Sequence, residues 1–325
     1  MKFLARRLLR AALLFVGVSA LCFLFTEMAP GNFFDEMRSN PQISPETIKA
    51  LRARYGLNQP LPVRYGRWLS AAMHGDFGYS IAYNVPVGPL LWTRAKNTLL
   101  LTTTATFLTW LVALPMGIWA ATRHERWLDK IVGVGTSLLI SIPEIVIAII
   151  LLAVAVRWRV VPTGGMMSLD FEGFSLWAKF QDITMRMLLP ALILVLAGLA
   201  VVVRHVRTSF LEVQRAPCIQ AARGYGIPRT RLLFRHILPL AANPVISLFG
   251  FSLAGLLSGS LLVEVVAGWP GLGPVILDAT LSRDLYLVIG GIMLSAVFML
   301  GGNLIADVLL VVSDPRISTG GKDAN

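Results

Sequence analysis

Glu144 stands out among the residues of this chain that could do chemistry, because of where it lies. It follows Pro143 inside residues 131–156, an apolar run with no other charged side chain. An ionisable group in such a run is a candidate for a functional site, because it is costly to remove a charge from water. Glu144 could line a path through the protein. It could equally be a satisfied packing carboxylate, or reach water near an interface.

Sequence motifs for nucleotide, metal or hydrolytic chemistry do not occur. There is no G-x-x-x-x-G-K-[ST] loop, and the nearest run, residues 320–323, lacks both the spacing and the hydroxyl. There is no H-E-x-x-H or G-x-S-x-G. The histidines and cysteines are scattered, without metal-ligand or disulfide spacing: His74, His124, His205, His236, Cys22 and Cys218. We therefore predict that this chain has no catalytic residue, metal site or cofactor and is not an enzyme.

A long basic segment, residues 218–244, has the composition of a docking surface. A short helix can form near its start, and the small side chains of Ala221 and Ala222 would let another protein approach closely. Gly226 permits a sharp exit from that helix. Pro239 stands in the first turn of the apolar run that follows. The alternative is an ordinary basic loop that obeys the positive-inside rule.

The composition indicates that lipid is the main solvent of this chain. Of its 325 residues, 55% are hydrophobic and only 14% are charged, whereas soluble domains carry about 25% charged residues. The formal net charge is +11, but the charges lie between apolar runs, not along one polar face. This placement favours membrane anchoring over binding to nucleic acid.

Six apolar runs are long enough to cross a bilayer core of about 30 Å. Each must be helical, because no water satisfies stray backbone amides there. The fold class is therefore an all-α integral membrane protein with six transmembrane helices. The first run resembles a signal peptide, but it is long and no A-x-A-like cleavage site follows, so we interpret it as a retained span. The runs are residues 11–26, 97–122, 131–156, 187–203, 237–263 and 285–306.

Lysine and arginine residues predict that both termini are cytoplasmic. With the N-terminus inside, the short inner segments 1–10, 123–130 and 204–236 are all basic. The long first outer stretch is basic too, but long loops are translocated largely regardless of charge. Arg204, His205 and Arg207, at the inner end of the fourth run, are interpreted as interface anchors.

The outer segments contain structure of their own. Ser44-Pro45-Glu46 predicts the start of a helix that ends near Gly56, and residues 62–73 predict a second helix. Tyr65, Trp68 and Leu69 would share one face of that second helix. The second and third outer segments, at 157–186 and 269–273, are expected to be loops. The domains are then residues 1–96, the first span and its outer loop; 97–317, a five-span core; and 318–325, a disordered tail.

The basic segment resembles a cytoplasmic signature of ABC importer permeases: E-A-A, three residues, G, nine residues, I-x-L-P. Gln220-Ala221-Ala222 is followed after three residues by Gly226, and after nine more by His236-Ile237-Leu238-Pro239. Gln220 replaces the acidic residue and His236 the isoleucine, while the spacing matches throughout. In that family the segment is the coupling helix, which docks in a groove of the ATP-hydrolysing subunit. Because Gln220 is uncharged, it cannot make an ion pair that the family's Glu makes, but the docking surface itself is still expected.

Other motifs resemble the B-type permease of dipeptide and oligopeptide systems, and the resemblance covers residues 1–317. They include the outer-loop run 55–61 with Gly75-Asp76-Phe77-Gly78, and Asn97-Thr98-Leu99 at the start of the second span. Glu264, with Trp269, Gly271 and Gly273, resembles the family's external turn. This turn is either a structural element or a contact to a binding protein. Arg283-Asp284, Asn303, Asp307 and Asp314-Pro315-Arg316 resemble the entry and exit of its last span.

The resemblance implies an inward peptide transporter of the bacterial cytoplasmic (inner) membrane that works by alternating access. Its implied partners are a second homologous permease, two ATP-binding subunits that hold ATP and Mg, an extracytoplasmic substrate-binding protein and the lipid bilayer. The family pattern does not require a Glu at position 144, but a Glu144 that faces the path could meet the amino terminus of a peptide. Nickel chelates, glutathione or sugars are the alternative substrates within the family. An ATP-independent secondary transporter is a further alternative, but only Glu144 fits the mid-membrane ion site that it needs.

Overall fold

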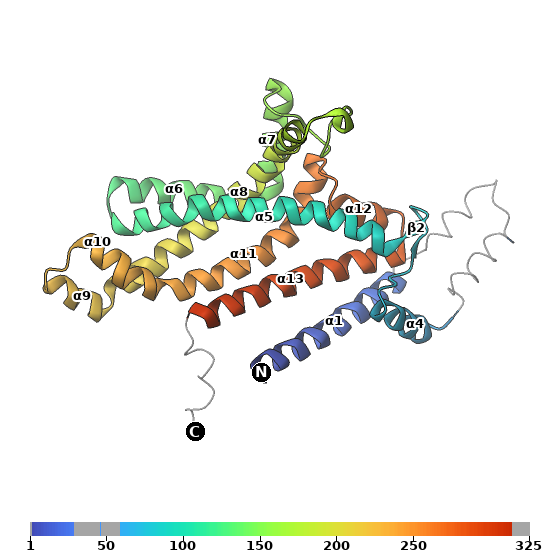
Figure 1. Ribbon diagram of the computed structural model, residues 1–325, viewed down its shortest axis with the longest axis horizontal. Helices are drawn as coiled ribbons and strands as arrows, with labels where there is room; N and C mark the ends of the chain where they lie inside the picture. The colour runs from blue at the N-terminus through green and yellow to red at the C-terminus, as the bar shows by residue number, and fades with distance from the viewer. Residues whose placement is uncertain (1, 29–45, 47–58, 314–325) are drawn as a thin grey trace. The chain divides into compact units, whose positions relative to one another are not determined.

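The computed structural model of the chain describes residues 2–28, 46 and 59–313, and these residues are helical almost throughout (Figure 1). The helix expected near residues 44–56, the run Asp314-Pro315-Arg316 and the tail at 318–325 lie outside the described residues. One short antiparallel pair of strands, β1 (Tyr79–Ser80) and β2 (Val85–Pro86), aligns Tyr79 with Pro86 and Ser80 with Val85.

The helices follow one another along the chain as a series of long apolar elements and short connecting ones. Among the described residues, four helices are long and apolar enough to cross a membrane, or up to six if each of two bent pairs is one crossing; within α1 the apolar stretch Ala12–Phe25 is shorter. The helices are α1 (Lys2–Met28), α4 (Leu61–Met73), α5 (Val87–Thr122), α6 (Trp127–Ser141), α7 (Glu144–Trp158), α8 (Leu176–Arg215), α9 (Pro217–Gly224), α10 (Arg229–Leu232), α11 (Leu238–Ala267), α12 (Leu272–Leu281) and α13 (Leu285–Ser313).

The chain forms two compact units, each with its own packing. The first contains Met1–Asn97 and Pro270–Val297, and the second contains Thr98–Trp269 and Phe298–Asn325. The division therefore falls within α5, close to the boundary expected after Lys96. The first unit also takes in α12 and the start of α13, which the sequence assigned to the five-span core.

In the first unit, α4 packs its aromatic face on α1. Trp68 is buried against Phe23, with the ring centroids 5.8 Å apart, and Tyr65 lies 5.5 Å from the same phenylalanine ring. The hydroxyl groups of Tyr65 and Ser19 are 2.9 Å apart. Tyr65, Trp68 and Leu69 all belong to this cluster, so the helix and the shared face expected at 62–73 are confirmed.

Hydrogen bonds to the Asp284 side chain connect the two short strands with the start of α13. The carboxylate accepts a hydrogen bond from Ser80 Oγ at 2.7 Å and one from the Ala82 backbone N–H at 3.0 Å. Its other oxygen accepts from the Leu287 N–H in the first turn of α13, at 3.3 Å. Asp284 is buried, and these hydrogen bonds from neighbouring protein groups compensate for the loss of water around its carboxylate.

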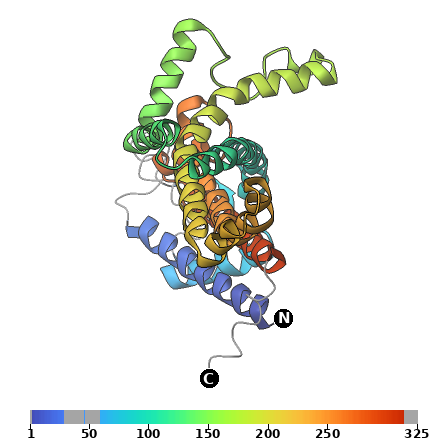
Figure 2. The ribbon, with the colours of Figure 1, turned by 90° about the vertical axis from the view of Figure 1, so that its left-hand side faces the viewer.

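In the second unit, α8 is the central helix and packs on α6, α7 and α11 (Figures 1 and 2). One core lies around Leu101, Ile193 and Trp269, and another lies around Val203, Phe210 and Ile237. Helices α5 and α8 approach closely at Gly117, where an added Cβ would lie 2.8 Å from the Val206 side chain. The second core continues into the basic segment and supports the site described below.

The third apolar run, expected as one helical span at 131–156, is not one continuous helix but a bent pair of helices. Helices α6 and α7 meet at Ile142-Pro143 and differ in direction by 96°. Ile142 is extended, with φ −93° and ψ 121°. A residue that precedes proline is pushed into this region, and proline has no N–H to continue a helix. Glu144 therefore begins a new helix.

Two further elements are more helical than expected. α8 has 40 residues, about 60 Å, whereas the apolar run predicted only 187–203. Ser175 caps its N-terminus by accepting from the Ala178 N–H at 3.3 Å, so the helix begins well before the apolar run. The turn at 269–273 leads directly into α12, a helix that was not expected from the sequence.

Candidate functional site

The basic segment begins with the short helix α9, as expected. Ala216 is extended, with ψ 139°, and this ends α8. Pro217 then occupies the first helical position, where its missing N–H costs nothing. The helix ends at Gly224, and Gly226 adopts φ +75°, the left-handed region that favours glycine. Gly226 therefore provides the sharp exit that the sequence predicted.

One side of α9 is anchored and the other is open. Ile219 is 2% exposed and packs in the cluster that contains Phe210. Cys218, Gln220 and Ala221 are exposed. Ala222 is half-buried against the same cluster, so of the two small residues only Ala221 is fully presented.

Tyr225 is an exposed aromatic residue that the sequence reading missed. Its side chain is 88% exposed and lies directly after α9. Tyrosine is enriched in protein–protein interfaces, so Tyr225 is a candidate contact beside α9. The sequence did indicate this exposure, because Tyr225 lies between two glycines, which have no side chains to cover it.

Gln220 has a local structural role. Its Nε2 donates a hydrogen bond to the backbone carbonyl of Arg215, at 3.1 Å, and so satisfies one of the last carbonyl groups of α8. An ionised carboxylate has no proton to donate. The glutamine therefore makes a contact at this junction that the acid of the family signature cannot make.

The return from α9 contains a wide helical turn before α11. Residues Leu233–Ile237 form a π-helical turn, and Pro239 lies in the first turn of α11. Pro239 cannot donate to the carbonyl four residues earlier, and its ring crowds that group, so a wider turn relieves the clash. Ile237 is buried in the same cluster as Ile219, which places both ends of the segment on one core.

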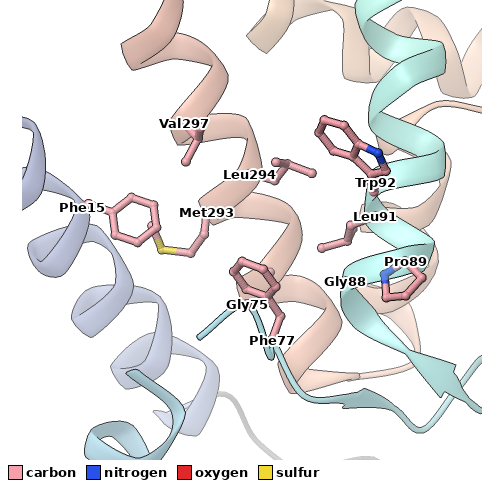
Figure 3. Close-up of a pocket in the computed structure, with 11 residues that line it drawn as sticks. Phe15, Gly75, Phe77, Gly88, Pro89, Leu91, Trp92, Met293, Leu294 and Val297 are labelled. Atoms are coloured by element: carbon pink, nitrogen blue, oxygen red, sulfur yellow. The ribbon is translucent and has the colours of Figure 1, made fainter. Parts of the chain in front are cut away.

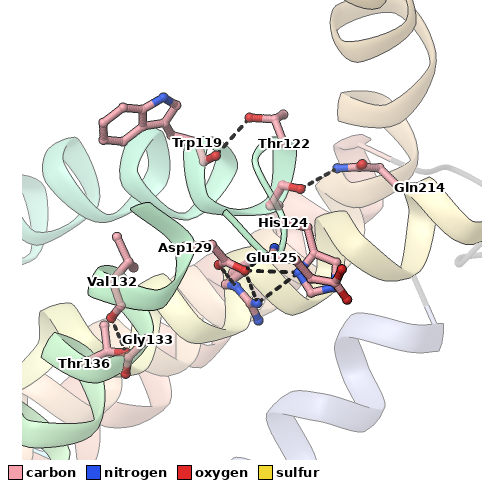
Figure 4. Close-up of polar contacts among 11 residues, drawn as sticks. Trp119, Thr122, His124, Glu125, Asp129, Val132, Gly133, Thr136 and Gln214 are labelled. Atoms are coloured by element: carbon pink, nitrogen blue, oxygen red, sulfur yellow. Dashed lines mark hydrogen bonds and ion pairs between the residues drawn. The ribbon is translucent and has the colours of Figure 1, made fainter. Parts of the chain in front are cut away.

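Polar side chains connect α8 with the turn between α5 and α6 and with the start of α6 (Figure 4). Arg207 on α8 donates from Nε to Asp129 Oδ1 at 2.6 Å and from Nη2 to Oδ2 at 2.8 Å. His124 Nδ1 lies 3.1 Å from the same Oδ2. Asp129 is 5% exposed. Of the three residues interpreted as interface anchors, Arg207 therefore pairs with a buried carboxylate, whereas Arg204 and His205 are exposed.

Glu144, the candidate for a translocation path, is the first residue of α7 and is half-buried. A Cβ added to Gly259 of α11 would lie 3.4 Å from its Oε2, so the carboxylate lies directly against this glycine. The small-residue pattern Gly255-x-x-x-Gly259 is typical of close helix packing. At Gly259 the close neighbour is the carboxylate, and at Gly255 a Cβ would meet nothing within 4 Å.

The external turn is built into the fold. Glu264 is 0% and Trp269 1% exposed, and the Trp269 N–H donates to the Glu264 carbonyl at 2.8 Å. Gly268, at φ +68°, ends α11, and Gly271 and Gly273 are buried. This burial favours the structural alternative over direct contact of these side chains with a binding protein.

The first unit contains an apolar cavity of about 290 Å³ (Figure 3). It is enclosed by α1, α5, α13 and the segment at 75–77, and it presents hydrocarbon and aromatic groups, with no charged side chain. Within residues 2–28, 46 and 59–313, His, Cys, Asp and Glu form no group of three or more that could hold a metal ion. The cavity is lined by Phe15, Gly75, Phe77, Gly88, Pro89, Leu91, Trp92, Gly290, Met293, Leu294 and Val297.

Similar proteins share the whole length of this chain. An oligopeptide transport system permease protein, AppB of Bacillus subtilis, is 34% identical, and the match covers 97% of this chain and 98% of the relative. A dipeptide transport system permease protein, DppB of Escherichia coli, is 35% identical over 98% of each chain. An oligopeptide transport system permease protein, OppB of Mycobacterium tuberculosis, is 31% identical over 97% and 98%.

Solved structures support the fold. An inward-facing structure of the MetNI methionine ABC transporter aligns with a TM-score of 0.52 at 18% identity, covering 68% of this chain and 96% of that one. Residues 1–102 match the N-terminal region, and residues 113–319 the main region, of binding-protein-dependent transport system inner membrane components. The chain therefore belongs to the family of inner membrane components of binding-protein-dependent transport systems.

Proposed function

We propose that this chain is one of two permease subunits of an ATP-driven importer that moves di- or oligopeptides inward across the cytoplasmic membrane. The observation that carries the proposal is the exposed helix α9, with its signature spacing, on a chain similar throughout its length to permeases named for peptides. Two ATP-binding subunits supply the energy by hydrolysing ATP with Mg. A second, homologous permease and an extracytoplasmic binding protein complete the assembly, and both termini of this chain face the cytoplasm.

In this function the basic segment receives the movement of the ATP-binding subunits. Ala221, Gln220 and Tyr225 offer the docking surface, and Ile219 fixes α9 to the core formed with Phe210. A push on α9 is therefore delivered to α8 and α11, not absorbed by a loose loop. Rocking of these helices exposes the central path to one side at a time, which is alternating access.

The broken span at Pro143 supplies the candidate path group. The helix break places Glu144 at the N-terminus of α7, where backbone N–H groups favour a carboxylate. Its contact with Gly259 keeps α7 and α11 close at this level. A carboxylate in this position suits the amino group that every unmodified peptide carries.

The test is uptake of labelled di- and oligopeptides by cells with and without this chain, repeated after ATP depletion at maintained membrane potential. We expect uptake that depends on the chain and is lost on depletion. If only nickel chelates, glutathione or sugars show this dependence, the substrate assignment is wrong and the importer class stands. Uptake that persists without ATP would replace the proposal with secondary transport.

A further inference from the structure

The turn between α5 and α6, Arg123–Arg126, is fixed to α8 by an ion pair with full hydrogen bonding. Both oxygens of Asp129 are used: Oδ1 accepts from Arg207 Nε, and Oδ2 accepts from Arg207 Nη2. Oδ2 also accepts from the Glu125 N–H at 3.0 Å, which shapes the turn itself. A bidentate pair of this kind fixes orientation as well as distance.

A second bridge joins the same region with α9. Gln214, near the end of α8, donates from Nε2 to the Ala121 carbonyl in the last turn of α5, at 3.3 Å (Figure 4). Its Oε1 accepts from Nη2 of Arg223 at 3.2 Å. Arg223 belongs to α9. One amide side chain therefore touches both α9 and the end of α5.

Positive-inside anchoring does not require this arrangement. An interface anchor projects its charge toward water and headgroups, as exposed Arg204 does from the same helix. Arg207 instead meets a carboxylate that is 5% exposed and lies 78 residues away in the sequence. Removing either partner would leave the other charge without its match in a restricted space.

We propose that Arg207, Asp129 and Gln214 are positioning residues that transmit the displacement of α9 to the α5–α6 turn. From there α6 carries the movement to the break at Pro143, next to Glu144. The inference rests on the proposed function, because it assumes that ATP-binding subunits move α9. It adds a second route for that movement beside the direct one through α8 and α11.

The first experiment measures the ratio of peptide taken up to ATP hydrolysed, in membranes that contain the assembled transporter. We expect Arg207→Gln and Gln214→Ala to lower the ratio about tenfold, within the range that single residues give to coupling between sites. Arg204→Ala, three residues away and exposed, is the matched control and should leave the ratio unchanged. Assembly is followed by co-purification of the partner subunits.

A double-mutant cycle separates the pair from its two members. If Asp129 and Arg207 act only through their ion pair, the double variant Asp129→Asn/Arg207→Gln should lower the ratio no further than either single variant. Arg207→Lys keeps the positive charge but cannot make the two parallel hydrogen bonds of the guanidinium group. It should therefore lower the ratio less than Arg207→Gln does. An unchanged ratio in Arg207→Gln and Gln214→Ala would overturn the proposal. So would failed assembly in every Arg207 variant, because the pair would then be structural only.

A substrate-independent measurement keeps this inference distinct from the proposed function. A cysteine replacing exposed Ser141, at the end of α6, is labelled with maleimide in a background of Cys22→Ser and Cys218→Ser. We expect ATP to change the labelling rate in the otherwise unaltered transporter and with Arg204→Ala, but not with Arg207→Gln. The relay is contradicted if ATP still changes the labelling rate in Arg207→Gln. It is also contradicted if ATP does not change the labelling rate in the transporter that retains Arg207. Both outcomes can be measured whichever solute is carried.

Discussion

Gly226 illustrates a residue that is required for its backbone and not for its size. An added Cβ would meet nothing within 4 Å, yet φ is +75°, a conformation that costs other residues about 1–2 kcal/mol. We expect Gly226→Val to distort the exit from α9 and to lower peptide uptake strongly, while the protein still reaches the membrane. The measurement is uptake normalised to the amount of permease in the membrane.

The chain supplies its own control for this change. Gly224 ends α9 two residues earlier; its φ is not positive and its surroundings are equally open. Gly224→Ala should therefore preserve uptake. Equal uptake in Gly226→Val and the wild type would remove the coupling role from this turn.

Glu144 is a second residue whose role can be tested by charge alone. Glu144→Gln preserves size and removes the negative charge that faces Gly259. If Glu144 meets the amino terminus of the substrate, uptake of peptides with a free amino group should fall about tenfold or more, since hydrogen bonds between charged groups are worth about 1.5–3 kcal/mol. Competition between free and N-acetylated peptides measures this preference. An equal fall for both peptides would assign Glu144 to packing.

At the scale of elements, the structure agrees with the sequence where the signal is local. Tyr65, Trp68 and Leu69 recur at helical spacing, so the sequence was sufficient to predict which face of α4 they share. Gly226 marked the exit from α9 equally well. The break at Pro143 was also signalled locally, but the apolar run continues through it, and hydropathy alone treated the two helices as one span.

The contacts that the sequence could not predict join distant segments. Asp129 and Arg207 are 78 residues apart, and Ser80 and Asp284 are 204 apart. A charged residue near the end of an apolar run looks the same whether it faces headgroups or a buried partner. Only the packing of α6 on α8 decides between the two, because it fixes which side of α8 is closed to water.

The connection between the strands and α13 gives a prediction at this scale. Replacing Asp284 by Ala leaves the buried Ser80 Oγ without its acceptor, which costs about 1–3 kcal/mol, and also removes the acceptor of the Ala82 N–H at the surface. We expect a lower thermal unfolding midpoint of the purified protein in detergent, measured by intrinsic tryptophan fluorescence.

Asp278 provides the exposed counterpart for that measurement. It accepts from the Tyr83 hydroxyl at 2.9 Å, and burial together with this hydrogen bond raises the pKa of Tyr83, so the phenol remains a donor at neutral pH. Because Asp278 is exposed, Asp278→Ala should shift the midpoint much less. A similar shift for both variants would mean that burial of Asp284 does not govern the strength of the connection.

At the scale of the whole molecule, the residues proposed for coupling and for the path all belong to one of the two units. The second unit contains α9, its supporting core, the Asp129–Arg207 pair and Glu144, so the groups assigned to energy coupling and to the path share one packed body. The first unit contains the strands, α12 and the apolar cavity. Substitutions that impair coupling should therefore concentrate between Thr98 and Trp269, the part of the second unit that contains all of these residues.

The sequence contains two cysteines, and their positions allow docking of α9 to be measured without engineering the site. Cys218 is exposed on α9 beside Gln220, and Cys22 is half-buried in α1. If α9 enters a groove of an ATP-binding subunit, that subunit must cover Cys218. Maleimide labelling of Cys218 should then be slower in the assembled transporter than in the isolated permease, by about tenfold when the partner is present at ten times its dissociation constant. A Cys22→Ser variant assigns the signal to α9, and equal labelling rates in the two preparations would show that α9 does not dock.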